Sequence, residues 1–174
     1  MFYKRQRSSD FIIGRVCLLA NEVAAFNDHD SQENIHWVYL IDGSVNIQCA
    51  NNEFNDTRTI SDQLVDLRNN KTSFFKFLSN NKGSTFLLFI TELDTPDQYT
   101  CKKLTVDKEI FLSTADNKQI IVPLVSDLEI KKTSASSFKK IPTTASVTLP
   151  TNTELIFRSS TVVKSHALLF TKIS

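Results

Sequence analysis

The chain has 174 residues, of which 41% are hydrophobic and 22% are charged, and this balance excludes an intrinsically disordered or fibrous protein. The 20 Lys and Arg residues against 19 Asp and Glu residues leave a formal net charge of +1, which argues against a main role in binding nucleic acid or an anionic membrane. The three cysteines include no CxxC pair, so they give no disulfide framework and favour a reducing compartment.

Short segments of alternating apolar and polar residues follow one another along the chain. They are rich in Val, Ile, Phe and Thr and are separated by Asn, Asp, Ser, Lys or Gly, which is typical of strands joined by turns. Only three glycines are present, so Asn and Asp must form most turns that need a positive φ. We therefore predict an all-β sandwich or barrel. The predicted strands are 11–20, 35–42, 44–50, 73–78, 85–91, 104–106, 109–113, 119–125, 128–132, 146–149, 154–157 and 166–173.

One segment also fits a helix. Ile60, Leu64 and Leu67 have helical spacing, and they lie close to Thr59 and Ser61, which are residue types that cap helix N-termini. We therefore allow at most one short helix in the chain, at this place.

The N-terminal residues contain a basic cluster, Lys4, Arg5 and Arg7, ahead of the apolar segment 11–20. This order superficially resembles a secretory signal, but Arg15 places a charge at the centre of the apolar segment, where a signal has none. We therefore predict a basic arm followed by a strand. No segment approaches the ~18 uninterrupted apolar residues of a membrane span. We expect a cytoplasmic or virion-associated protein that has no membrane partner.

The two halves of the chain share three blocks of sequence. Because one small β-unit exposes an apolar face that it cannot bury alone, packing against a duplicate would cover that face. We predict a first half at 1–92, a connection at 93–100 and a second half at 101–174. The blocks pair 67–70 with 149–152 (149 − 67 = 82), 84–89 with 165–170 (170 − 89 = 81) and 38–47 with 122–130 (122 − 38 = 84).

The first half resembles the first motif of the cupin superfamily, G-x5-H-x-H-x(3,4)-E-x6-G. His29 stands in the place of the first histidine, Ser31 in that of the second, and His36 in that of the glutamate. The opening glycine is replaced by Val23, whereas the closing glycine, Gly43, is kept.

The second half resembles the second cupin motif, P-x-G-x2-H-x3-N. Pro150 is kept, Asn152 replaces the glycine, Leu155 replaces the metal-binding histidine and Ser159 replaces the asparagine. In the first half the same counting puts Ser73 at the histidine position. The chain is therefore similar to a bicupin, and the resemblance implies two tandem jelly-roll barrels.

A cupin metal centre needs three imidazoles and a carboxylate that converge inside one barrel, because a single ligand holds a divalent ion poorly. The replacements leave His29 and His36 in the first half and remove the whole set from the second. We therefore predict no catalytic residues, no metal and no cofactor.

Our primary interpretation is a non-catalytic β scaffold that acts as a structural or protein-interaction component. Its partners would be other protein subunits, including further copies of itself. The usage of Asn, Lys, Ile and Phe suggests an AT-rich coding source, such as a bacteriophage or other virus, in which compact β modules serve as particle components. The predicted partner contacts are the basic residues and one aromatic residue, Lys4, Arg5, Arg7, Phe74, Lys139 and Lys140.

A competing interpretation places a small molecule in the first barrel. The predicted ligand-binding residues are His29, His36, Tyr39 and Ser73. The cupin resemblance implies a sugar or small acid as the ligand and an isomerase, epimerase or metal-dependent oxygenase as the enzyme class. A third interpretation, RNA or DNA contact through 4–7 and 131–140, conflicts with the near-neutral net charge.

The Ser-rich segment 133–140 is bounded by two lysine pairs, Lys131–Lys132 and Lys139–Lys140. We interpret the pairs as solvated flanks of a loop, with a phosphate or acidic-partner site as the alternative. Among the 13 phenylalanines, the neighbours Phe74 and Phe75 must point to opposite faces of a strand. One of them then serves either an interface between the halves or a partner surface.

Overall fold

The computed structural model describes residues 2–8, 10–27, 35–51, 54–60, 64–68, 74–79, 85–93, 98–143, 145–162 and 164–173. The chain divides into two compact units, Met1–Pro96 and Asp97–Ser174. All regular secondary structure in the described residues is β-strand. No helix long and apolar enough to cross a membrane is found among those residues.

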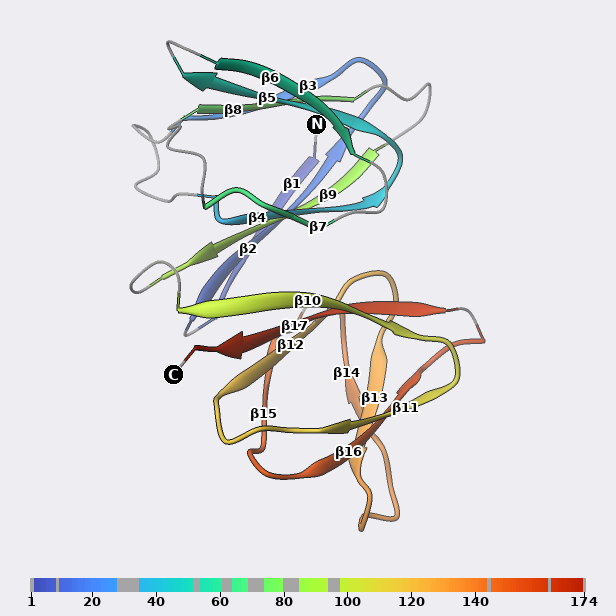
Figure 1. Cartoon of the computed structure of the whole chain (residues 1–174). Coiled ribbons are helices and arrows are strands. Elements are labelled where there is room, and N and C mark those ends of the chain that lie inside the picture. Colours follow the sequence, from blue (N-terminus) through green and yellow to red (C-terminus); the bar gives the residue numbers. More distant parts are fainter. Residues whose placement is uncertain are drawn as a thin grey trace. The chain divides into compact units, whose positions relative to one another are not determined.

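The first unit contains two antiparallel sheets (Figure 1). One sheet has five strands in the order β1-β2-β9-β4-β7, and the other has four in the order β3-β8-β5-β6. The strands are β1 (Phe2–Arg7), β2 (Phe11–Leu18), β3 (Val23–Asn27), β4 (Trp37–Asp42), β5 (Val45–Asn51), β6 (Phe54–Ile60), β7 (Leu64–Asp66), β8 (Phe74–Ser79) and β9 (Thr85–Glu92).

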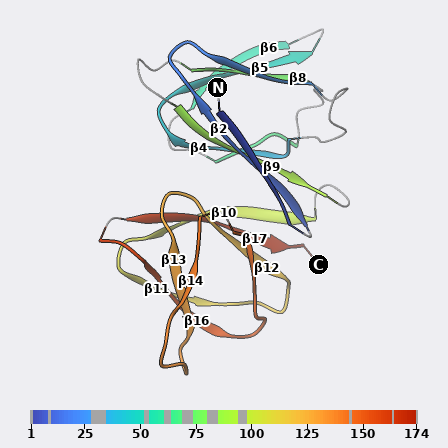
Figure 2. The same ribbon diagram turned by 180° about the vertical axis from the view of Figure 1, so that it is seen from behind.

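The second unit also contains two antiparallel sheets, and Figure 2 shows it from behind. Their strand orders are β10-β17-β12-β15 and β11-β16-β13-β14. The strands are β10 (Tyr99–Val106), β11 (Glu109–Ser113), β12 (Gln119–Pro123), β13 (Leu128–Lys132), β14 (Lys139–Ile141), β15 (Val147–Leu149), β16 (Glu154–Ser159) and β17 (Ser165–Lys172).

The two units have the same topology. Strands β2 to β9 correspond in chain order to β10 to β17, because β2-β9-β4-β7 matches β10-β17-β12-β15 and β3-β8-β5-β6 matches β11-β16-β13-β14. Each unit is thus a double-sheet jelly roll, in which these successive strands alternate between the sheets except for the hairpins β5–β6 and β13–β14. This confirms the predicted fold class, two tandem jelly rolls, and adds β1 as an extra edge strand of the first unit.

The interior of each roll follows from the alternation of side chains along its strands. In β2, Val16 and Leu18 lie in the core of the first unit, whereas the alternate residues Arg15 and Cys17 are only partly buried. That core combines residues from both sheets or their flanks, among them Val38, Val45, Leu67 and Phe89. The core of the second unit contains the counterparts Val106, Ile121, Leu128, Leu149 and Leu169.

Strand pairing fixes which residues of the two units correspond. Phe11 pairs with Glu92 and Tyr99 pairs with Lys172, so β9 and β17 correspond at an offset of 80 (172 − 92). The block offset of 81 derived from the sequence was one residue too large, and such a slip exchanges the two faces of a strand. Phe89 therefore corresponds to Leu169 in the other core, not to Phe170. The pairing of Leu67 with Leu149 is confirmed, because each lies in the core of its unit next to the matching strands β7 and β15.

The strands decide three further expectations from the sequence, of which only the basic arm was wrong. The possible helix around 60–67 is not formed by the described residues of that segment, since Ile60 ends β6 and Leu64 begins β7, whose pairing with β4 overrides the helical spacing. This agrees with the expectation of at most one short helix. The basic arm is a strand, β1, which pairs with β2 along its whole length. Lys131 and Lys132 end β13 and Lys139 and Lys140 begin β14, so the two lysine pairs flank the loop 133–138 as predicted. The alternation rule also failed to find β3, β6 and β7.

Asparagine forms two tight turns, as expected from the scarcity of glycine. Asn21 lies between β2 and β3 with φ 61°, and Asn152 lies between β15 and β16 with φ 47°. Gly43, between β4 and β5, has φ 97°. These left-handed conformations suit Asn and Gly better than other residues.

Candidate functional site

His36 lies directly before β4 and is buried, with 6% of its surface exposed. Its backbone N–H donates to the Ile90 carbonyl at 2.9 Å, and its carbonyl accepts from the Leu67 N–H at 2.8 Å. The imidazole meets the Trp37 indole edge to face, at 5.9 Å between ring centroids and 86° between planes. These contacts hold the backbone of His36 between the neighbouring strands β9 and β7.

Tyr39 lies in the middle of β4 and is 1% exposed. Val38 and Leu40 on either side of it belong to the core of the first unit. Because neighbouring side chains on a strand point to opposite faces, Tyr39 lies on the face turned away from this core. The other two predicted ligand-binding residues, His29 and Ser73, lie outside the described residues.

An ion pair holds the end of β7 next to Trp37. The Arg68 Nη2 and Nε atoms donate to the Asp66 carboxylate at 2.6 and 3.0 Å, and the guanidinium lies 4.5 Å from the centroid of the Trp37 ring. The hydrogen bonds from Arg68 lower the pKa of Asp66. Since Asp66 is 42% exposed at its side chain, this pair contributes modestly to stability and offers no enclosed site.

The turn of the second cupin-like motif is present in the second unit. Asn152 takes the left-handed conformation that the motif needs from its glycine. The Thr114 hydroxyl donates to the Pro150 carbonyl at 2.6 Å, and the Asn152 side-chain amide donates to Asp116. The backbone of the motif is therefore retained, although its metal ligand is not.

Leu155 stands where the motif has its metal-binding histidine. It is 2% exposed and packs in the core of the second unit with Phe157 and Leu149. Its partner across the sheet is Lys132. The Leu155 side chain has no atom that can ligate a metal, and the positive charge of Lys132 opposite it would repel a divalent cation.

The residues of the second unit do not fit a cupin metal centre. Residues 98–174 contain one histidine, His166, and one cysteine, Cys101. His166 alternates along β17 with Ala167, which lines the core, so its side chain lies on the other face. Its Nδ1 atom lies 3.3 Å from the Thr105 hydroxyl. Within the part of the chain that the structure describes, no group of three or more His, Cys, Asp or Glu residues could hold a metal ion.

The first unit has an apolar residue at the corresponding place. Cys49 pairs with Phe75 as Lys132 pairs with Leu155, and the neighbouring pairs, Val45 with Ser79 and Leu128 with Ser159, fix this correspondence. Phe75, not Ser73, therefore occupies the strand position of Leu155. The first unit has two more residues between its core leucine and this position (75 − 67 = 8) than the second (155 − 149 = 6), which explains why counting from the motif gave Ser73.

The predicted partner-contact residues belong to different sheets. Lys4, Arg5 and Arg7 lie on the edge strand β1, opposite Arg15, Gly14 and Ile12 of β2. Arg7 is exposed. Phe74 begins β8, where it pairs with Asn27 of β3.

The two C-terminal basic residues of that prediction face opposite ways. Lys140 forms an ion pair with Asp127 at 2.8 Å, which raises the pKa of the lysine and lowers that of the carboxyl group. Lys139 pairs across the sheet with Ile130, which packs against the core, so it shares the inner face of the roll.

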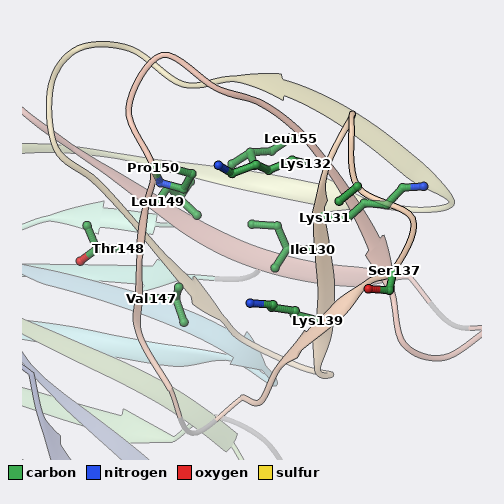
Figure 3. Close-up of a pocket in the computed structure, with 11 residues that line it drawn as sticks. Ile130, Lys131, Lys132, Ser137, Lys139, Val147, Thr148, Leu149, Pro150 and Leu155 are labelled. Carbon is green, nitrogen blue, oxygen red and sulfur yellow. The ribbon is translucent and has the colours of Figure 1, made fainter.

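A cavity of about 410 Å³ opens at this end of the second roll (Figure 3). Apolar groups from both sheets line it, and Lys132 and Lys139 reach over it. The sequence analysis did not find this cavity, although the alternation of residues 128–132 already assigns Lys132 to the face of Leu128 and Ile130. Its apolar lining consists of Ile130, Ala135, Val147, Leu149, Pro150 and Leu155.

Comparison with known proteins supports the fold. No family model and no curated protein matches the chain. The solved cupin 2 conserved barrel domain protein from Leptotrichia buccalis is similar at a TM-score of 0.50 and 13% identity, covering 99% of this chain and 88% of that one. The chain has a cupin fold.

Two other structures support this bicupin arrangement. AerE from Microcystis aeruginosa is similar at a TM-score of 0.65 and 7% identity, over 99% of this chain and 92% of that one. A single-residue variant of the oxalate decarboxylase of Bacillus subtilis, itself a bicupin, is similar at a TM-score of 0.64 and 6% identity, over 95% of this chain and 69% of that one. Identities this low establish the shared fold and leave the activity to be argued from the residues.

Proposed function

We propose that this bicupin is a non-catalytic β scaffold that acts as a structural or protein-interaction component. The observation that carries the proposal is Leu155, which packs in an apolar core and pairs with Lys132 at the position where the cupin motif has a metal-binding histidine. Cupin chemistry depends on several ligands converging on one ion. In the second roll the residue at this position contributes to the hydrophobic core and offers no metal ligand.

The first unit supports the same proposal. Phe75 holds the strand position of Leu155, and apolar residues such as Val38, Val45 and Leu67 form the core of this unit. His36 is the histidine of this unit that the structure describes, and its imidazole packs against the Trp37 indole.

A scaffold of this kind acts through its outer surfaces. Phe111 on β11 is 73% exposed, and next to it across the sheet is Ile156 of β16. Exposed aromatic groups contribute strongly to protein interfaces because they bury a large apolar area at a small cost in side-chain entropy. The proposed partners are other protein subunits of a larger assembly, including further copies of this chain, and a phage or virus particle is the assembly that we favour.

Native mass spectrometry of the protein from its natural source tests the proposal. We expect a complex whose mass exceeds that of the single chain and that contains no stoichiometric metal. Phe111→Ser should weaken this complex, whereas the matched control Phe138→Ser should not, because Phe138 is covered by Lys131 and Arg158. A monomer with one bound transition-metal ion would contradict the proposal.

The second candidate is a small-molecule binder or enzyme that uses the first roll. The observation in its favour is a buried imidazole, His36, in a fold that also supports oxalate decarboxylase. Under this alternative, His36→Ala would abolish binding of a sugar or small acid without loss of folding. Unchanged binding in that variant would eliminate the candidate.

A further inference from the structure

Two lysines of the second unit point toward the interior of the roll. Along β13, Leu128 and Ile130 pack in or against the core, so Lys132 has the same orientation. Along β14, Ile141 lies in the core and Lys139 shares its face. Inward-facing lysines are unusual at the end of an apolar barrel, where a hydrophobic residue would complete the packing.

These lysines lie over an apolar cavity. Figure 3 shows Lys132 and Lys139 extending from two strands over the space between Ile130, Val147 and Pro150, whereas the Lys131 amine points away from it. The cavity volume, about 410 Å³, lies within the usual range of small-molecule sites, roughly 300–1,000 Å³. The aliphatic parts of the lysines add to the apolar wall, and their ammonium groups remain in water.

Nearby acidic residues do not neutralise this pair. Asp127 is bound to Lys140 at 2.8 Å, and Glu129 is bound to Arg158 at 2.5 Å on the outer face of the same sheet. Among the described residues, neither Lys132 nor Lys139 has an ion-pair partner, and no acidic residue lines the cavity. The entrance therefore has a local charge of about +2 above an apolar floor.

From this arrangement we propose that the second roll binds a small organic anion with an apolar body, namely an aliphatic carboxylate. The hydrocarbon chain would lie against Val147, Leu149 and Leu155, and the carboxylate would lie between the Lys132 and Lys139 ammonium groups. This binding needs no metal ion and involves no covalent step. It goes beyond the proposed scaffold function and can fail without affecting it, because the scaffold is tested by the mass of its complex.

Titration of the ¹⁵N-labelled full chain with sodium octanoate, followed by NMR, tests the proposal. We expect saturable binding with the largest shift changes at Ile130, Val147 and Leu149. 1-Octanol, which has the same chain without the charge, should bind at least about three-fold more weakly, because a solvent-exposed ion pair contributes only modestly. Added salt should weaken octanoate binding and leave octanol binding unchanged.

Matched lysine variants show whether the anion is recognised at this place. Lys132→Gln and Lys139→Gln should each raise the octanoate Kd by roughly three- to five-fold. Lys131 also lines the cavity, but its ammonium group lies 4.8 Å from the centroid of the Phe138 ring and points away from the cavity (Figure 3). Lys131→Gln makes the same change of charge one residue away and should therefore change the octanoate Kd much less than Lys132→Gln.

A filled cavity provides a third measurement. Val147→Phe should abolish octanoate binding, and its thermal unfolding curve shows whether the variant still folds. The proposal would be overturned if octanoate and octanol bound equally, if Lys131→Gln weakened binding as much as Lys132→Gln, or if no saturation occurred with the folded wild-type chain.

Discussion

The two rolls have the same strand topology but differ at one end of the sheet β11-β16-β13-β14 and of its counterpart β3-β8-β5-β6. Lys132, Leu155 and Lys139 of the second roll occupy the strand positions of Cys49, Phe75 and Arg58 in the first. The residues behind them are alike in type, since Leu149 corresponds to Leu67 and Val147 to Val65. The comparison shows that the core residues of the two rolls are alike in type, whereas the residues at this end of the rolls differ.

The largest expected effect comes from the matched core leucines. Leu67→Ala and Leu149→Ala should each lower the free energy of unfolding of their own unit by about 2–5 kcal/mol, because each leaves a cavity in a packed interior. Denaturant unfolding followed by hydrogen exchange measures both units separately. If either substitution lowered the free energy of unfolding by less than about 1 kcal/mol, the two cores would not be equivalent.

A second comparison concerns Leu155, which stands where the second cupin motif has its metal-binding histidine. Leu155→His should cost about 1–3 kcal/mol, since it buries a polar ring among apolar neighbours. It should not create a site for Zn²⁺ or Ni²⁺, because Lys132 lies opposite and no second imidazole faces the interior in the described residues. Titration calorimetry with each metal gives the answer, and tight 1:1 binding would contradict our account of this roll.

One tight turn in each unit, at a different place in the roll, can be compared by mutation. Gly43 has φ 97° and Asn152 has φ 47°. Gly43→Ala should destabilise the first unit by about 1–2 kcal/mol because an alanine Cβ is strained at positive φ. Asn152→Gly should be nearly neutral or slightly stabilising by comparison. Thermal unfolding of the two variants measures this difference, and an equally large loss for Asn152→Gly would show that the Asn152 side chain, not its backbone, matters most.

The smallest effect concerns pH. Arg68 lowers the pKa of Asp66, so the carboxylate stabilises the first unit at neutral pH, and this contribution disappears as the pH falls through the lowered pKa of the folded state. Asp66→Asn should remove this acid-sensitive part, which amounts to less than about 1 kcal/mol for so exposed a pair. Fluorescence of the single tryptophan, Trp37, reports the transition. An acid transition identical in the variant and the wild type would exclude this role of Asp66.

Much of the fold could be predicted from the sequence because strong alternation marks the buried strands. The predicted ranges 109–113 and 128–132 coincide with β11 and β13. Strands β3, β6 and β7 were missed because they are short or carry many polar residues, and their pairing with better-patterned neighbours makes them strands.

The site was harder to predict than the fold. Motif counting located Pro150, Asn152 and Leu155, because the turn geometry limits the choice of residues there. It misplaced the first-half counterpart at Ser73, because the longer segment before β8 cannot be aligned without the strand register. The cavity under Lys132 and Lys139 lies between β13 and β14 of one sheet and β15 of the other, so it depends on how the two sheets pack, which the sequence pattern does not give.

The metal content of the protein tests the central claim most directly. The chain should be produced in medium containing Fe, Mn, Ni and Zn, dialysed against buffer without chelator, and analysed by mass spectrometry for total metal. Our account predicts well under one ion per chain, unchanged by His36→Ala. One retained ion per chain, lost on that substitution, would contradict a non-catalytic bicupin.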